Sequence, residues 1–147
     1  MTEQTANVSS DIDNAHTVEV FLSALQAQDL TTADAQLDDN LVYQNVGFPT
    51  IRGRKRAMKI FKGLQRPSFG FEVKIHRIAV NGPVVLTERT DVLAIGPVRL
   101  QFWVCGVFEV HNGRITLWRD YFDMYDMLKA TVRGLIGAVL PGLRPTL

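Results

Sequence analysis

Four strand-length stretches between residues 71 and 122 constrain the fold of this chain more than any other feature. They read FEVKIHRIAV, VVLTERTDVLAI, VRLQFWVCGVFEV and RITLWRDYFD, and they are separated by Asn81-Gly82-Pro83, Gly96-Pro97 and Asn112-Gly113. Gly, Pro and Asn pairs between apolar runs are typical of hairpin turns. The pattern therefore predicts a four-stranded antiparallel meander.

Helical spacing of apolar residues is found mainly before this meander. It predicts a helix over residues 13–28, a short helix after residue 31 and a third helix over residues 53–65, with a strand at about 41–46. An apolar, helix-compatible segment over residues 124–140 closes the chain. Helices that precede an antiparallel sheet indicate an α+β fold with helices packed on one face of a curved sheet.

The length of 147 residues and the hydrophobic content of 46% suit one globular domain. Residues 1–12 are small and polar, so we expect a flexible N-terminal lead before a single domain over residues 13–147. The single cysteine, Cys105, excludes an internal disulfide and a cysteine zinc cluster. This cysteine usage fits a reducing compartment, and a cytoplasmic location is expected.

The charge pattern argues against a nucleic-acid-binding protein. The net charge is only +1, although basic residues gather between 52 and 66, where there is no acid. In the predicted helix over 53–65, Ala57, Ile60, Phe61 and Leu64 share one stripe and the basic residues lie opposite. We interpret the basic side as the solvated face of a core helix, because it lacks the interleaved aromatic residues of single-strand binders.

The stretch LTERTDVLAI, residues 86–95, carries charge in the middle of a predicted strand. Successive side chains of a strand point to opposite faces, so the buried face takes either Thr87, Arg89 and Asp91 or Glu88 and Thr90. Burying charge of this kind is costly unless the charge is paired and hydrogen-bonded.

Two further strands repeat this arrangement. Tyr43 and Asn45 share one face of their strand, and Trp118, Asp120 and Phe122 share one face of the last strand. Each set is polar in the middle with apolar neighbours, as a deep pocket with a small polar floor requires. An ordinary solvent-exposed face remains the alternative interpretation of each set.

The motifs YQN at 43–45, ERTDVL at 88–93, GVF at 106–108 and WRDYFD at 118–123 together resemble the limonene-1,2-epoxide hydrolase family. The resemblance runs in register from about the first helix to Asp126. It implies the cone-shaped fold of the nuclear-transport-factor-2-like, or SnoaL-like, superfamily. That fold has a mixed, mostly antiparallel sheet of about six strands, with about three to four helices over its concave face.

The resemblance also implies a reaction, the one-step hydrolysis of an epoxide to a vicinal diol without a metal, a cofactor or a covalent intermediate. Asp120 would be the general base, and Tyr43 and Asn45 would orient the attacking water. Asp91 would be the acid that protonates the epoxide oxygen, and Arg89 would bridge the two carboxylates.

The chemistry of these residue types agrees with such roles. Opening an epoxide near neutral pH needs both an activated nucleophile and a proton for the leaving alkoxide. Two carboxylates in one apolar pocket do not ionise equally, so one can serve as acid and the other as base. A guanidinium can bridge such a pair through two donor edges, which a lysine cannot do.

Strand alternation, together with family pocket positions, predicts the apolar wall of the pocket. The expected wall residues are Leu22, Leu25, Leu64, Leu93, Phe102, Val104, Trp118 and Phe122. A plain hydrophobic core is the other interpretation of each. Because the sequence shows no second polar cluster, the expected substrate is a small, lipophilic, mostly hydrocarbon epoxide. Terpene, fatty and sterol-like epoxides are not distinguished.

The C-terminal segment is more apolar than the family pattern. Its expected apolar face needs cover from the cavity mouth, a partner subunit or a membrane surface. The residues of this face are Met127, Leu128, Val132, Leu135, Ile136, Val139 and Leu140. Members of the family are typically dimers through the sheet, so a homodimer is expected.

Two other functions remain open for the same fold. One is a proton transferase similar to ketosteroid isomerases or polyketide cyclases, in which Tyr43 would be an oxyanion donor and an Asp the base. It offers no evident use for Arg89 between two acids. The other is a non-catalytic protein that binds lipophilic molecules, which would not need Asp91, Arg89 and Asp120 together.

Overall fold

The computed structural model describes residues 2–147. Its helices are α1 (Thr2–Gln26), α2 (Leu30–Ala35), α3 (Arg54–Leu64), α4 (Met124–Val139) and the 3₁₀ turn η1 (Pro141–Leu143). Its strands are β1 (Leu37–Asn45), β2 (Ile51–Arg52), β3 (Phe69–Asn81), β4 (Val84–Ile95), β5 (Val98–His111) and β6 (Arg114–Tyr121). The fold is α+β with one open, six-stranded mixed sheet, as predicted.

The predicted meander is confirmed, and it makes up most of the sheet. The strand order is β2-β1-β6-β5-β4-β3, in which β3 to β6 pair antiparallel with their chain neighbours. Gly82, Gly96 and Gly113 take positive φ values of 58°, 58° and 73° in the hairpin turns, where a side chain would be strained. Strand β1 joins β6 in parallel, which makes the sheet mixed.

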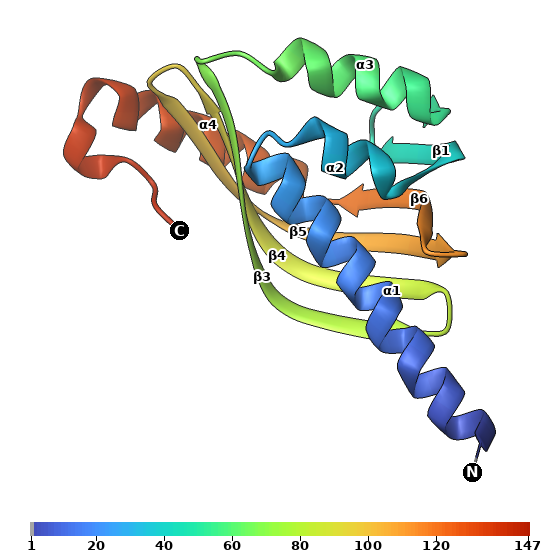
Figure 1. Cartoon of the computed structure of the whole chain (residues 1–147). Helices are drawn as coiled ribbons and strands as arrows, with labels where there is room; N and C mark the ends of the chain where they lie inside the picture. The colour runs from blue at the N-terminus through green and yellow to red at the C-terminus, as the bar shows by residue number, and fades with distance from the viewer. Residues whose placement is uncertain (1) are drawn as a thin grey trace.

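Helices α1, α2 and α3 cover one face of the strongly curved sheet, and α4 lies at the end of the sheet away from the N-terminus (Figure 1). Val18, Phe21 and Leu22 of α1 are fully buried in the main core. Phe21 contacts Trp118 of β6 edge to face, with 5.0 Å between ring centroids. Packing of this apolar stripe holds α1 across the sheet.

The start of α1 differs from the helix start predicted near residue 13. The helix begins at Thr2 rather than near residue 13, and its exposed first turns project beyond the sheet in Figure 1. Once the buried turns around Phe21 have formed, each added residue gains a hydrogen bond without a new nucleation cost. The small polar composition of residues 1–12 does not reveal this extension.

Helix α3 is rotated slightly from the predicted stripe. Ala57 and Phe61 are buried as expected, but Met58 is buried in place of Ile60, which is 41% exposed. The side of the helix that carries Ala57 and Met58 therefore faces the core, and Ile60 faces away from it. The adjacent basic residues Lys55 and Lys59 are exposed.

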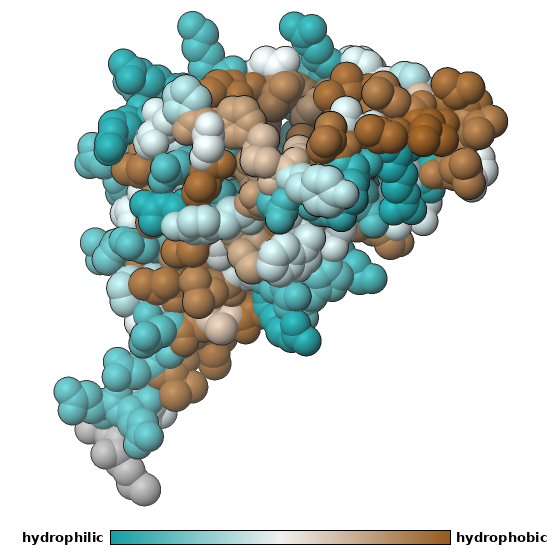
Figure 2. All heavy atoms as spheres, turned by 180° about the vertical axis from the view of Figure 1, so that it is seen from behind, coloured by the Kyte–Doolittle hydropathy of each residue, from teal (hydrophilic) through white to brown (hydrophobic). Residues whose placement is uncertain are grey.

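Helix α4 packs through small residues and leaves its large apolar residues outside. Asp123 caps its start by accepting hydrogen bonds from the backbone N–H groups of Tyr125 and Asp126, at 2.7 and 3.1 Å. Ala130, Gly134 and Gly137 form the buried side. The exposed apolar residues of this helix and its end are Leu128, Val132, Leu135, Ile136, Val139 and Leu140. Figure 2 shows apolar side chains gathered where α4 lies. Within residues 2–147, no helix has the length and apolarity needed to cross a bilayer.

Substitution of Gly134 by Ala tests how α4 is attached. An added Cβ would lie 2.6 Å from the Arg99 carbonyl oxygen, on the backbone of β5. We expect Gly134→Ala to lower the free energy of unfolding by about 1–3 kcal/mol, because the backbone contact cannot yield cheaply. The measurement is the midpoint of urea unfolding at unchanged slope.

The matched control is Gly63→Ala in α3, where an added Cβ meets nothing within 4 Å. Helix propensity alone favours this change by about 0.5–1 kcal/mol. If both variants gain stability equally, α4 is not held by close contact at Gly134.

Candidate active site

Strand β4 supplies the charged floor of the site. Thr87, Arg89 and Asp91 are only 3%, 0% and 4% exposed. The alternate residues face the other side of the sheet, where Glu88 pairs with Arg77. Of the two possible faces, the structure thus buries the one that carries opposite charges side by side.

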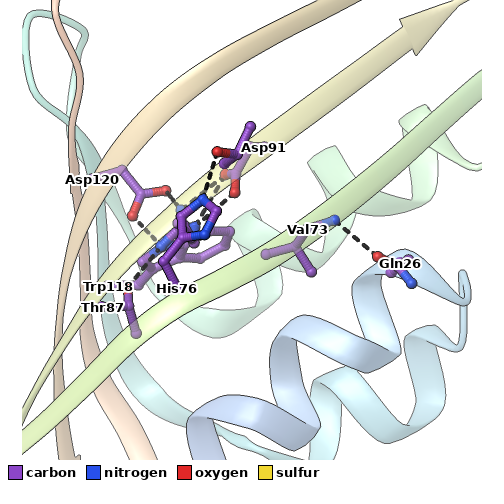
Figure 3. A network of polar contacts seen from close by, with 9 residues as sticks. Gln26, Val73, His76, Thr87, Asp91, Trp118 and Asp120 are labelled. Atoms are coloured by element: carbon purple, nitrogen blue, oxygen red, sulfur yellow. Dashed lines mark hydrogen bonds and ion pairs between the residues drawn. The ribbon is translucent and has the colours of Figure 1, made fainter. Parts of the chain in front are cut away.

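Arg89 contacts both carboxylates of the site. Its Nε donates to Asp91 Oδ1 at 2.9 Å, and its Nη2 donates to Asp91 Oδ2 at 3.1 Å and to Asp120 Oδ2 at 2.5 Å. Its Nη1 donates to Thr87 Oγ1 at 3.2 Å. Figure 3 shows Asp91 and Asp120 turned toward the same space, with dashed lines converging between them.

Gly106 of β5 makes this bridge possible; it belongs to the GVF motif of the family resemblance, but no role was predicted for it. Strand β5 lies between β4 and β6, and Gly106 is opposite Thr87 on one side and Asp120 on the other. A Cβ at Gly106 would clash with Arg89 Nη1 and lie 2.7 Å from Thr87 Oγ1. A glycine inside a strand often marks such a close approach, and this was the available signal.

The parallel pairing of β1 with β6 brings the remaining polar residues to Asp120. Asn45 is opposite Asp120, and Tyr43 is opposite Trp118 and stacks on it with 4.3 Å between centroids. Trp118 Nε1 donates to Asp120 Oδ1 at 2.8 Å, and Asn45 Nδ2 donates to the Tyr43 hydroxyl oxygen at 2.8 Å. The Tyr43 proton and Asn45 Oδ1 remain available to a bound molecule.

Burial changes the acidity of these groups. It raises the pKa of Asp91 to about 6, against the opposing pull of Arg89, and it also raises the pKa of Asp120. It raises the pKa of Tyr43 to about 12, so the phenol stays protonated. Burial lowers the pKa of Arg89, but attraction to Asp120 and Asp91 outweighs this and keeps the guanidinium charged. When the two carboxyls hold one proton between them they carry one negative charge, which the positive charge of Arg89 balances.

A cavity of about 500 Å³ opens above this floor. The predicted residues that line it are Tyr43, Asn45, Asp91, Asp120, Leu25, Leu64, Leu93, Phe102, Val104, Trp118 and Phe122. Leu22 is the exception, because it is fully buried in the main core one turn before Leu25. Arg89 lies behind the carboxylates rather than on the cavity surface.

The sequence analysis missed several other lining residues. Phe69 and Phe71 of β3 line the cavity, and their spacing of two was a usable signal. Gln28 and Gln65 also line it, but they come from segments between regular elements, where alternation gives no guidance. No three His, Cys, Asp or Glu side chains in the described part of the chain are grouped so that they could hold a metal ion.

Comparison with known proteins places the chain first by fold and then by family. An NTF2-like protein of unknown function from Burkholderia pseudomallei superposes with a TM-score of 0.70 at 17% identity, covering 81% of this chain and 97% of that one. At this identity the likeness shows the fold alone. Residues 12–133 match the limonene-1,2-epoxide hydrolase catalytic domain. The chain belongs to the limonene-1,2-epoxide hydrolase family.

Matches from Mycobacterium tuberculosis, one curated protein and one solved structure, are much closer in sequence. Epoxide hydrolase EphG is 62% identical over 130 residues, which are 88% of this chain and 87% of that protein. A solved structure described as an LEH-like epoxide hydrolase is 58% identical, with a TM-score of 0.90 over 93% of this chain and 97% of that one. The recognised family and fold are thus confirmed.

The raised pKa of Asp91 predicts how its substitution changes stability with pH. The folded protein holds this proton more tightly than the unfolded chain does. The protonated carboxyl therefore stabilises the fold fully below the ordinary pKa of 3.8, and this stabilisation is lost as pH rises through about 6. The amide introduced by Asp91→Asn cannot lose a proton, so between pH 4 and pH 7 the free energy of unfolding of this variant should rise by about 2–3 kcal/mol relative to that of the parent protein. Urea unfolding at each pH measures the difference.

Asp13→Asn serves as the control, because it makes the same change of side chain at an exposed position of α1. Parallel pH curves for Asp91→Asn and the parent protein would contradict the raised pKa.

Proposed function

We propose that this protein converts a lipophilic epoxide to a vicinal diol by direct attack of one activated water. Epoxide hydrolysis as the class of reaction follows from the family and from the matches of high identity. The observation that carries the mechanism is the buried Asp91–Arg89–Asp120 bridge at the floor of an apolar cavity.

The water would be bound by three groups at the floor. One water proton is given to Asp120 and the other is donated in a hydrogen bond to Asn45 Oδ1, while the Tyr43 hydroxyl donates to the water oxygen. The remaining lone pair then faces the epoxide carbon. Orientation of this kind lowers the barrier because the reacting atoms need no further ordering.

Asp91 supplies the proton for the leaving oxygen. With a pKa raised to about 6, its carboxyl group holds a proton that a surface aspartate would lose. As water attacks the carbon and the C–O bond breaks, Asp91 protonates the oxygen while Asp120 takes the water proton. The net charge of the bridge is the same before and after, so Arg89 stabilises both arrangements.

The bridge favours hydrolysis over the other reactions open to this fold. A proton transferase needs one carboxylate base, and a binding protein needs none, whereas here Arg89 contacts two buried carboxyls at once. Isolated buried charges are costly, so their retention in a lipophilic cavity suits a reaction that uses both an acid and a base.

The homodimer expected from the family stays a prediction. In its favour, Leu86, Trp103 and Tyr121 are exposed on three neighbouring strands, on the face away from the cavity. A cytoplasmic location also stays a prediction, and a membrane surface stays one of the three alternatives for the cover of the apolar face of α4.

Replacing either carboxyl group tests the mechanism. We expect Asp91→Asn and Asp120→Asn each to lower kcat for a lipophilic epoxide by about 10²-fold to 10⁴-fold, because the acid or the base is lost. The control is Glu88→Gln, on the same strand but on the opposite face, which should keep parental activity. Diol formation is measured by mass spectrometry.

A single turnover in ¹⁸O-water with enzyme in excess separates direct water attack from a covalent route. Direct attack places the label in the diol on the first turnover. Label found in the protein, with unlabelled first product, would rule out the mechanism proposed.

The rate should also depend on pH through Asp91. We expect kcat/KM to fall as pH rises above about 6, because the free enzyme loses the proton that the epoxide oxygen needs. Initial rates across a pH series, with each buffer checked for protein stability, give the profile. A value of kcat/KM that does not change on the alkaline side would exclude Asp91 as the acid.

A further inference from the structure

The cavity has a second polar pair, Gln28 and Gln65, which corrects the expectation that no such cluster exists. Both residues line the cavity together with Asp91 and Asp120. Gln28 follows the end of α1 and is half-buried, whereas Gln65 caps the end of α3 and is exposed. Neither glutamine has a role in the hydrolytic mechanism proposed above.

Hydrogen bonds fix the orientation of both amide groups. Gln28 Nε2 donates to the Phe69 carbonyl oxygen at 2.8 Å, and Gln65 Nε2 donates to the Gln28 carbonyl oxygen at 3.2 Å. Because a carbonyl oxygen can only accept a hydrogen bond, the amide nitrogen of each side chain must face the backbone as the donor. Each side-chain Oε1, and the second N–H of each amide, is left for another partner.

The backbone of Gln28 supports this arrangement. Its φ is 56°, a left-handed conformation that is uncommon for a residue with a side chain. Contacts on both sides hold it there, since its side chain is bound to Phe69 and its carbonyl oxygen to Gln65. Left-handed backbone conformations are energetically unfavourable for residues with a side chain, and they are often found at functional sites.

The register of β3 gives the distance of this pair from the floor. Val73 is opposite Asp91, and Phe69, which holds Gln28, is opposite Ile95 at the other end of the pairing. Four residues along a strand span about 13 Å. Apolar side chains such as Phe71 and Leu93 line the cavity between the two ends.

We infer that Gln28 and Gln65 bind a hydroxyl group that the substrate carries about 10–13 Å from its epoxide ring. This inference rests on the proposed function. A hydroxyl can donate to an amide oxygen and accept from the free amide N–H, whereas a hydrocarbon leaves both unpaired. Among the described residues that line the cavity there is no Lys or Arg, so an alcohol fits this end better than a carboxylate. The substrate class is a lipophilic epoxide with one distant hydroxyl.

Three matched epoxides test the inference. They are a straight-chain epoxide with a terminal hydroxyl about 10 Å from the ring, its O-methyl ether and its deoxy analogue. For the parent protein, KM should be at least about 5-fold to 10-fold lower for the alcohol than for the other two, with kcat unchanged. The alcohol gains a donated hydrogen bond over the ether, and it gains an accepted one as well over the deoxy analogue. Gln65→Leu should remove this preference.

Two further variants complete the design. Gln28→Leu should also lose the preference, and Gln65→Leu covers the case in which Gln28→Leu does not fold, because Gln65 is exposed. Gln36→Leu, at the end of α2 and outside the cavity, should keep the preference. Equal KM values for the three epoxides in the parent protein, or a preference that survives in Gln65→Leu, would overturn the hydroxyl site and leave epoxide hydrolysis standing.

Binding without turnover separates failure of this site from failure of the proposed function. If none of the epoxides reacts, calorimetric titration with the epoxide-free alcohol and its methyl ether still tests the site. Tighter binding of the alcohol that depends on Gln65 supports it, and equal binding overturns it. A carboxylate analogue that binds more tightly than the alcohol would show that an anion is recognised, and the hydroxyl assignment would be wrong.

Discussion

The contact of Arg89 with Asp91 and Asp120 is the interaction on which the rest of this structure depends. A buried guanidinium between two buried carboxyls costs desolvation energy, which is offset only when every donor has a partner. Each of the three nitrogens of Arg89 donates to one or both of the aspartates or to Thr87. The group can then be neutral with one proton, which suits paired acid and base chemistry.

The order of the strands in the sheet allows this bridge to form. Strand β5 separates the two carboxyl-bearing strands, so Arg89 has to pass over a residue without a side chain, and Gly106 provides it. On the other side of β6, the parallel strand β1 adds Tyr43 and Asn45 next to Asp120. The helices close a largely apolar cavity over these residues.

Much of the site could be predicted from the sequence, and the failures have physical causes. Strand alternation placed Arg89 and Asp91 on one face, and resemblance to a family supplied the reaction. Leu22 was assigned to the pocket because helical spacing cannot tell cavity from core on one stripe. Gln28 and Gln65 were missed because their position depends on a left-handed residue and on hydrogen bonds between distant segments.

The amino-acid sequence alone determined the hairpins, the α+β class and the side chains that share a face, because turn chemistry and the period of a strand are local properties. The tertiary structure decided which strands are neighbours, and hence that Asp120 lies within hydrogen-bonding distance of Arg89. It also decided the raised pKa of Asp91 and the polar far end of the cavity. These depend on burial and on contacts between residues far apart in the chain, which no local pattern encodes.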